Sequence, residues 1–441
     1  MNYFANRRNP IESLDLDKAN EMFAAIDKQF GTDWLNKDEN HPLQILWKRR
    51  DHLSSTELLS LGNAIISIEN IDPDWVKDQI SKTLLDKNNR NGAFFEIIGL
   101  SYLINKHHSV TPAKKSQPGF DAVVSKASGG KVHLSLKKYD LSQKHKEFNE
   151  CAKKIEALVI DLIKHHNLLS TLVFIAKVDQ YPERKNWAEI YDDLKGLFTQ
   201  YSKDKKPIFG VTNGNWLVKI SELTGDNKFS ESHQSYTFIT STPYYKNENK
   251  NLYSKIDEAC HNLDAHGVYE DDDKVNLLFI HLPETASVPA CTKYANEYFE
   301  QWPDVKLSGV IFYQPTFVMD LENKATHVDH GFSFALNSDR YNKWVLKHGA
   351  LAFDNLLGST SSGGTKIKIM NGQDDNGIDL SEAYVYQSGH HYYSFQAGEG
   401  LIPINFTAPG LVSHAIITLE KHQPSIELTG IFPATSELKL L

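Results

Sequence analysis

Residues 92–137 constrain the fold most, because a helical pattern and two strand patterns follow one another there. Residues 92–104 are apolar on nearly every side, which is typical of a helix that is buried all round. Residues 118–124 and 131–137 have the composition and alternation of strands. The polar connection between them ends in Gly129 and Gly130, which suits a hairpin. The order predicts a buried helix followed by two antiparallel strands.

One acid interrupts the apolar helix. Glu96 lies between Phe95 and Ile97, so we expect its side chain at or near the interior. An ionised carboxylate is costly there unless it is paired, hydrogen-bonded or bound to a cation. Two interpretations stay open, a capped or salt-bridged structural glutamate and an acid that serves a functional site.

The strands carry an acid and a lysine at predictable positions. Asp121 begins the first strand directly after the turn at Pro118 and Gly119. In residues 131–137 the even-numbered positions are apolar, so Ser135 and Lys137 share the face opposite to them. If the strands pair, Asp121 and Lys137 come close in space. A surface ion pair of little energetic worth is the simple interpretation, and the buried acid upstream favours a site instead.

In this order, Glu96, Asp121, Ser135 and Lys137 resemble the motifs of the PD-(D/E)XK nuclease superfamily, over roughly residues 90 to 180. The resemblance implies a restriction-endonuclease-like α/β (α+β) core with a mixed sheet. It departs from the family pattern at Ser135, which stands where a second metal-binding acid is usual. Some restriction endonucleases with Ser-x-Lys recruit a glutamate from the following helix. Glu147 and Glu150 are available here, and the spacing from Lys137 favours Glu150. If neither faces the site, one metal would be held by Asp121, Glu96 and a backbone carbonyl, or the site is degenerate.

The resemblance also implies roles and a cofactor. Mg²⁺, with Mn²⁺ as an alternative, is expected on Asp121, Glu150 and the carbonyl of Leu136, with Glu96 holding a second ion or its water shell. Lys137 is expected to orient a water molecule and to stabilise charge on the phosphate. The implied reaction is hydrolysis of a phosphodiester that leaves a 5′-phosphate and a 3′-hydroxyl.

The distribution of charge matters more than its sum. The chain has a formal net charge of -9, unlike a protein that coats nucleic acid. Residues 101–166, however, contain 12 lysines against 6 acids. Phosphate attraction and a solvated, lysine-rich helix face are both open explanations. The lysines expected to contact nucleic acid are Lys114, Lys115, Lys138 and Lys144.

Cysteine usage and the N-terminal residues bear on location. Cys151, Cys260 and Cys291 lie far apart and form no CxxC pair, which favours a reducing compartment. The first residues lack the apolar stretch of a signal peptide, and no apolar run is long enough to span a bilayer. We therefore expect a cytoplasmic protein without membrane contact.

Composition along the chain predicts four regions. Residues 1–90 form a helical region, with helices expected over 19–30, 42–50, 55–66 and 74–85, and residues 91–224 form the nuclease-like core. Residues 225–357 repeat an α/β pattern, as a second unit or as a continuation of the core sheet. After the Gly/Ser-rich stretch 358–365, residues 366–441 are expected to form a β-rich C-terminal module.

Three classes of function stay open. The first is a Mg²⁺-dependent endonuclease that acts on DNA, with RNA as an alternative substrate, in restriction or in defence against foreign DNA such as that of viruses. The second is a catalytically degraded nuclease-fold protein that acts in nucleic-acid binding or protein assembly. The third is a protein-interaction component, with a homodimer or partner contact through the N-terminal helices or the C-terminal β module.

Overall fold

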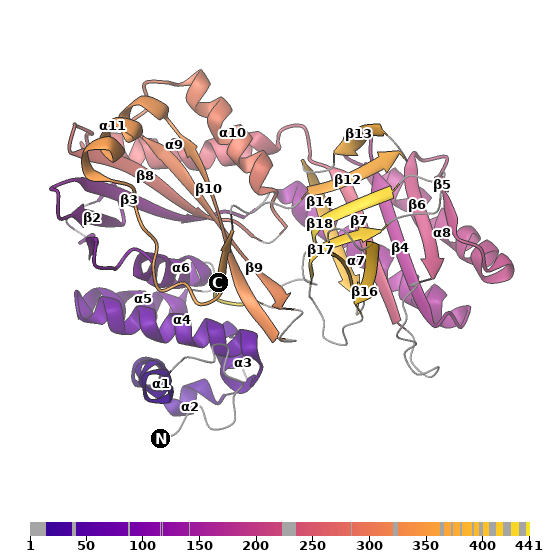
Figure 1. The fold of residues 1–441 in the computed structure, drawn as a ribbon, viewed down its shortest axis with the longest axis horizontal. Coiled ribbons are helices and arrows are strands. Elements are labelled where there is room, and N and C mark those ends of the chain that lie inside the picture. Colours follow the sequence, from indigo (N-terminus) through magenta and orange to yellow (C-terminus); the bar gives the residue numbers. More distant parts are fainter. Residues whose placement is uncertain are drawn as a thin grey trace.

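Two lobes, each built on a mixed β-sheet with helices against it, make up the described part of the computed structural model (Figure 1). The structure describes residues 15–37, 41–86, 89–114, 116, 118–140, 142–222, 235–283, 285–320, 325–361, 366–371, 374–379, 382–389, 392–396, 400–404, 412–417, 425–431 and 438–441. These residues form 11 helices, so the chain has the mixed α/β class expected from its sequence. Among the described helices, none is both long and apolar enough to cross a membrane.

Six helices open the first lobe. They are α1 (Leu16–Phe30), α2 (Thr32–Leu35), α3 (Pro42–Lys48), α4 (His52–Glu69), α5 (Pro73–Leu85) and α6 (Arg90–Ser101). Each of the four segments predicted to be helical is a helix, and the caps explain where two of them begin. The carboxylate of Asp51 accepts the N–H of Ser54 at the start of α4, and Asp72 accepts that of Trp75 at the start of α5.

The sheet of the first lobe has seven strands in the order β1-β2-β3-β8-β9-β10-β11. Their bounds are β1 (His108–Pro112), β2 (Ala122–Lys126), β3 (Lys131–Lys138), β8 (Lys274–His281), β9 (Gly309–Asp320), β10 (Ala325–Leu336) and β11 (Ser359–Ser361). The strands β1, β2 and β3 are antiparallel, as predicted for the last two, whereas β8 runs parallel to β3. The helices that follow in this lobe are α9 (Glu248–Ala265), α10 (Val288–Gln301) and α11 (Ser338–His348).

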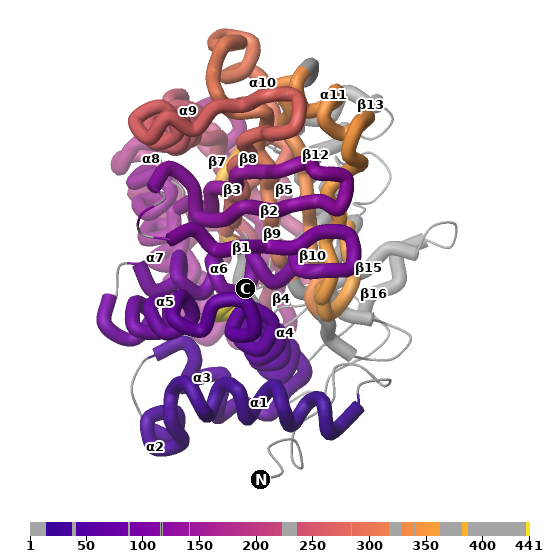
Figure 2. The backbone as a smooth tube through the Cα atoms, turned by 90° about the vertical axis from the view of Figure 1, so that its left-hand side faces the viewer, coloured from indigo at the N-terminus to yellow at the C-terminus, as the bar shows by residue number. Residues whose placement is uncertain are grey.

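The central strand β8 is buried on both faces, and the side chains of β3 and β8 alternate between two cores. Val132, Leu134 and Leu136 pack in one core with α4 and α6, as predicted. Leu278 and Ile280 of β8 point to the opposite face and pack with α9 and α10 in a second core. Figure 2 shows α4 and α6 running beneath the strands of this lobe.

The second lobe is inserted between β3 and α9. It holds α7 (Gln143–His165), β4 (Ser170–Lys177), α8 (Arg184–Asp204), β5 (Ile208–Val211), β6 (Trp216–Glu222) and β7 (Ser235–Pro243), joined by the later strand β14 (Ala383–Gly389). Its sheet has the order β14-β7-β4-β6-β5. The helices α7 and α8 pack on this sheet, and their core is continuous with the one beneath α9 and α10.

The strands group differently from the expected regions. Strands β8 to β11 extend the sheet of β3, which corresponds to the alternative of one continuous sheet, while β4 to β7 leave it. Within residues 366–441, β14 joins the inserted lobe, and a separate sheet has the order β13-β12-β18-β17. The remaining bounds are β12 (Lys366–Asn371), β13 (Asp374–Asp379), β15 (Tyr392–Gln396), β16 (Gly400–Ile404), β17 (Val412–Ile417) and β18 (Ser425–Ile431). Strand pairing over such separations depends on tertiary packing, which local composition does not encode.

The last described residues return to the N-terminal helices. The buried carboxylate of Glu57 in α4 accepts the main-chain N–H groups of Lys439, Leu440 and Leu441 at 2.7, 2.6 and 3.1 Å. The C-terminal end therefore lies beside α4 and α6, as Figure 2 shows. These residues contribute to the core of the first lobe and not to a C-terminal module.

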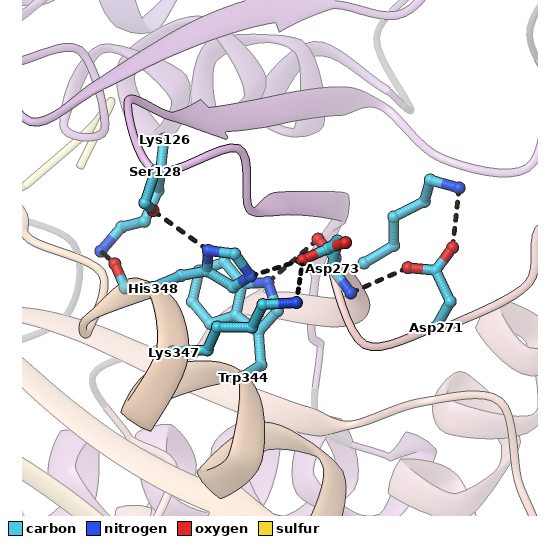
Figure 3. Close-up of polar contacts among 8 residues, drawn as sticks. Lys126, Ser128, Asp271, Asp273, Trp344, Lys347 and His348 are labelled. Carbon is cyan, nitrogen blue, oxygen red and sulfur yellow. Dashed lines mark hydrogen bonds and ion pairs between the residues drawn. The ribbon is translucent and has the colours of Figure 1, made fainter.

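A polar clamp holds the β2–β3 hairpin against α11 (Figure 3). The Nζ of Lys126 donates to the carbonyls of His348, Gly349 and Ala350, which are left open at the end of the helix. The ring of His348 bridges the hydroxyl of Ser128 at 3.1 Å and the carboxylate of Asp273 at 2.9 Å. The hairpin is thus fixed at its turn, which leaves the other ends of β2 and β3 to form the cavity described next.

Candidate functional site

A cavity of about 310 Å³ lies where β2 begins and β3 ends. Helices α5 and α6 and the loop before β2 form its walls, and Asn262 of α9 also lines it. Its lining consists of Trp75, Asp78, Gln79, Lys82, Glu96, Ala113, Lys114, Pro118, Gly119, Phe120, Asp121, Ser135, Lys137 and Asn262. Four of the residues singled out in the sequence, from one helix and two strands, therefore share one cavity: Glu96, Asp121, Ser135 and Lys137.

The end of a strand ladder positions Asp121. The N–H of Asp121 donates to the carbonyl of Leu134 at 2.8 Å, which is the last main-chain bond before the strands separate. At the next hydrogen-bonding position along β3, the Asp121 carboxylate takes the place of a main-chain acceptor and accepts the N–H of Leu136 at 2.7 Å. Because the N–H and C=O of a strand residue point to the same side, the carbonyl of Leu136 also faces this gap.

Glu96 is partly buried on α6, as expected, and its electrostatic surroundings are unusual. Burial, with the Asp121 carboxylate nearby, raises the pKa of Glu96 to about 7, while Lys82, Lys137 and a hydrogen bond from Gln79 act in the opposite direction. Burial also raises the pKa of Asp121, against the N–H of Leu136 and the same two lysines. Two carboxylates that share a desolvated space favour a bound proton or a cation between them.

Lys137 meets an acid from a helix that comes much later in the sequence. Its Nζ lies 3.4 Å from Oε1 of Glu258 in α9, a residue 121 positions away. The Lys137 side chain is 27% exposed, so its ammonium group remains accessible from the cavity. The hydroxyl of Ser135 lies on the same face, and Ser135 is only 5% exposed because α9 covers this side of the sheet.

The structure does not bring Glu150 to the cavity, nor Glu147. Glu150 is exposed on α7, which packs on the sheet of the inserted lobe, and Glu147 binds Lys144 of the same helix at 2.7 Å. The expectation relied on the helix that follows Lys137 in sequence. The chain leaves the first lobe after β3, so the helix beside Lys137 in space is α9.

The four lysines expected to contact nucleic acid have different surroundings. Lys114 lines the cavity. Lys144 pairs with Glu147 and lies over the rings of Tyr181 and Tyr245 in the inserted lobe, away from the cavity. Lys138 is partly buried at the end of β3. Lys115 lies outside the described residues.

Sequence reasoning missed the contribution of α5. Trp75, Asp78, Gln79 and Lys82 all line the cavity, and they occur at positions i, i+3, i+4 and i+7 of one helix. That spacing places them on a single helical face. The spacing of Asp78, Gln79 and Lys82 on one helical face, just before the apolar helix of Glu96, could have indicated that α5 contributes to the site.

The donor set suits a hard divalent cation without forming a dense acidic cluster. In the described part of the chain, no three His, Cys, Asp or Glu side chains come together as a metal site. Three carboxylates line the cavity, those of Asp78, Glu96 and Asp121, together with the amide of Gln79, and the carbonyl of Leu136 faces the same gap. Such oxygen ligands are those that Mg²⁺ and Mn²⁺ prefer.

Comparisons with known proteins gave no match: no protein-family model, no curated protein and no solved structure matches the chain. The chemistry of the cavity therefore carries the functional argument.

Proposed function

We propose that the protein is a metal-dependent nuclease that hydrolyses phosphodiester bonds of DNA. One observation carries this proposal: Glu96, Asp121, Ser135 and Lys137, separated by up to 41 residues in sequence (from 96 to 137), line a single cavity. Two desolvated carboxylates beside an accessible ammonium group form an arrangement that suits a cation and a phosphate together.

The order of elements supports a restriction-endonuclease-like core. A helix with a glutamate (α6) precedes an antiparallel hairpin with Asp121 directly before β2 and the Ser-x-Lys pair in β3. The helix α9 follows, and the later strands β8 and β9 extend the same sheet. The described residues between β3 and α9 form most of the inserted lobe. An insertion at this point explains why the acid nearest Lys137 is Glu258 and not a residue of α7.

Each residue of the cavity then has a defined task. Asp121 and Glu96 would hold Mg²⁺ or Mn²⁺, with the carbonyl of Leu136 available on the same side. A bound cation supplies polarisation of the phosphate and a lower pKa for a coordinated water. Lys137 neutralises charge that develops on the phosphate oxygens, and Glu258 keeps its ammonium group at the cavity.

DNA is the proposed substrate, and restriction or defence against foreign DNA is the proposed setting. Lys82 and Lys114 line the cavity and supply attraction for the phosphate backbone. By the resemblance, the products carry a 5′-phosphate and a 3′-hydroxyl, which end-labelling of the products would establish.

The test is a cleavage assay with purified protein on duplex DNA, single-stranded DNA and RNA, with Mg²⁺, Mn²⁺ or EDTA. We expect cation-dependent cleavage that Lys137→Ala and Asp121→Ala abolish. The matched control is Lys154→Ala, an exposed lysine on α7, which should retain full activity. If no nucleic acid is cut under any of these conditions, the degraded core that acts in nucleic-acid binding or protein assembly replaces this proposal.

A further inference from the structure

Gln79 is an unusual residue in the wall of the cavity. It belongs to α5, outside the segment that resembles the nuclease motifs, and its side chain is only 3% exposed. It nevertheless lines the cavity beside Glu96 and Asp121. A buried amide group offers donors on its nitrogen and an acceptor on its oxygen, and each costs free energy when it has no partner.

The two ends of the Gln79 amide differ in their surroundings. The Gln79 side chain acts to lower the pKa of Glu96, and an ionised carboxylate only accepts hydrogen bonds, so the amide nitrogen is the end that lies toward Glu96. The oxygen, Oε1, is buried and has no hydrogen-bond partner among the described residues. Gln79 borders the cavity, so a group bound there is available to satisfy Oε1.

We propose that Gln79 Oε1 is a ligand of the cation in this cavity, together with the carboxylates of Glu96 and Asp121. This inference rests on the proposed function and names the donor that replaces the acid absent at Ser135. Amide oxygens are ordinary ligands of hard divalent cations, and two carboxylates with one neutral oxygen balance a charge of +2. The missing ligand is thus supplied from the N-terminal helical region, upstream of the motifs.

The arrangement gives α5 a role beyond packing. The amide nitrogen of Gln79 binds Glu96 and its amide oxygen binds the ion, so the side chain of this α5 residue positions two members of the site. Lys82 lies on the same helical face, three residues further on, and borders the cavity as a phosphate contact. The helical region and the sheet therefore build the site jointly.

The test measures Mn²⁺ binding by calorimetric titration at pH 8 without nucleic acid, for the full chain and four variants. Gln79→Leu should weaken Mn²⁺ binding by at least about 10- to 100-fold, which is the loss found for outer-shell partners of metal ligands, because a direct ligand contributes no less. Gln44→Leu is the matched control, because Gln44 is also buried, donates to the carbonyl of Trp34 and has an Oε1 without a partner among the described residues. It lies on α3, away from the cavity, and should leave Mn²⁺ binding unchanged.

Gln79→Glu keeps the test decisive if Gln79→Leu does not fold. A third carboxylate at this position should lower the melting temperature in EDTA and raise it in Mn²⁺ by more than in the unaltered protein. A glutamine that only supports Glu96 predicts a lower melting temperature in both solutions, and that result overturns the proposal.

Asp121→Asn separates this inference from the proposed function. If Asp121→Asn abolishes Mn²⁺ binding and Gln79→Leu does not change it, Gln79 is no ligand, its oxygen is satisfied by water, and the nuclease proposal stands. If the unaltered protein binds no Mn²⁺ at all, both proposals fail together.

Discussion

Two glutamates with different surroundings, Glu248 of α9 and Glu96 of α6, can be compared directly. Glu248 at the start of α9 accepts the N–H of Ser142 at 3.1 Å, the hydroxyl of Ser142 at 2.5 Å and the hydroxyl of Tyr384. It joins α9 to α7 and β14, so it fastens the inserted lobe to the first. Glu96 has the amide of Gln79 and, beside it, a second carboxylate at Asp121.

The difference lies in how completely each carboxylate is satisfied. Neutral donors from two elements surround Glu248, which is what a structural buried acid requires. Glu96 shares a desolvated cavity with another acid, and burial raises the pKa values of both. Incomplete satisfaction of clustered acids, rather than burial alone, marks the candidate site.

The largest expected effect is the loss of activity in Asp121→Asn. The amide oxygen still accepts the N–H of Leu136, so the strand ends keep their geometry, but the charge is gone. We expect cleavage to fall by at least about 100-fold, in line with the loss of a single electrostatic contact to a transition state. The melting temperature in EDTA should hardly change. If Asp121→Asn cuts DNA at the normal rate, Asp121 is not part of the catalytic site.

The second effect is on stability, at the other glutamate. Glu248→Ala removes the shared acceptor of the Ser142 N–H and of the Ser142 and Tyr384 hydroxyls, which as donors retain their contact with each other at 3.1 Å, and this costs about 2 kcal/mol. Urea unfolding should reveal this loss, while Mn²⁺ binding of the folded protein stays normal. Reduced Mn²⁺ binding in this variant would break the division between a structural and a functional glutamate.

The third effect is a dependence of stability on pH. The pKa values of Glu96 and Glu57 are both raised by burial from 4.5 to about 7. Between these values each glutamate keeps in the folded protein a proton that the unfolded chain has released, so the contribution of these two groups to the free energy of unfolding falls as pH rises through this window. Below about pH 4.5 both states are protonated, and above about pH 7 both are ionised, so the change is confined to the interval. The buried His145 and His281, whose pKa values burial lowers, act in the opposite direction.

Compared with the unaltered protein, Glu96→Gln and Glu57→Gln should each remove their own part of that contribution, and the double variant should remove both parts. Unfolding in urea at pH 5 and pH 7.5, with EDTA present, measures the difference. If the change in the free energy of unfolding between pH 5 and pH 7.5 is the same in Glu96→Gln as in the unaltered protein, Glu96 is solvated. Its surroundings then do not differ from those of Glu248 in the way described above.

The smallest effect compares the two helices that compete for the place beside Lys137. Glu258→Gln removes a partly exposed ion pair, for which we expect a rate about two- to fivefold lower, because such pairs contribute about 1 kcal/mol or less. Glu150→Gln should leave the cleavage rate unchanged, since Glu150 does not line the cavity. The reverse ranking would mean that α7, and not α9, completes the site.

Much of the local structure could be predicted. The apolar period around Glu96, the glycine turn at Gly129 and Gly130, and the alternation in residues 131–137 each produced the element and the face that the structure shows. Local periodicity predicts these features because it reflects which side of an element is buried. The strand β1 and the helix α11 carry weaker patterns and were missed.

The sequence by itself determined that Glu96, Asp121, Ser135 and Lys137 occur in this order on a helix and two strands, with Asp121 and Lys137 at strand ends. Only the tertiary structure decided which side chains surround them. A lobe inserted after β3 put Glu258 rather than Glu150 beside Lys137, and the packing of α5 on α6 brought Gln79 to Glu96. Periodicity records one element at a time, whereas a site is assembled by packing between elements that are far apart in the chain.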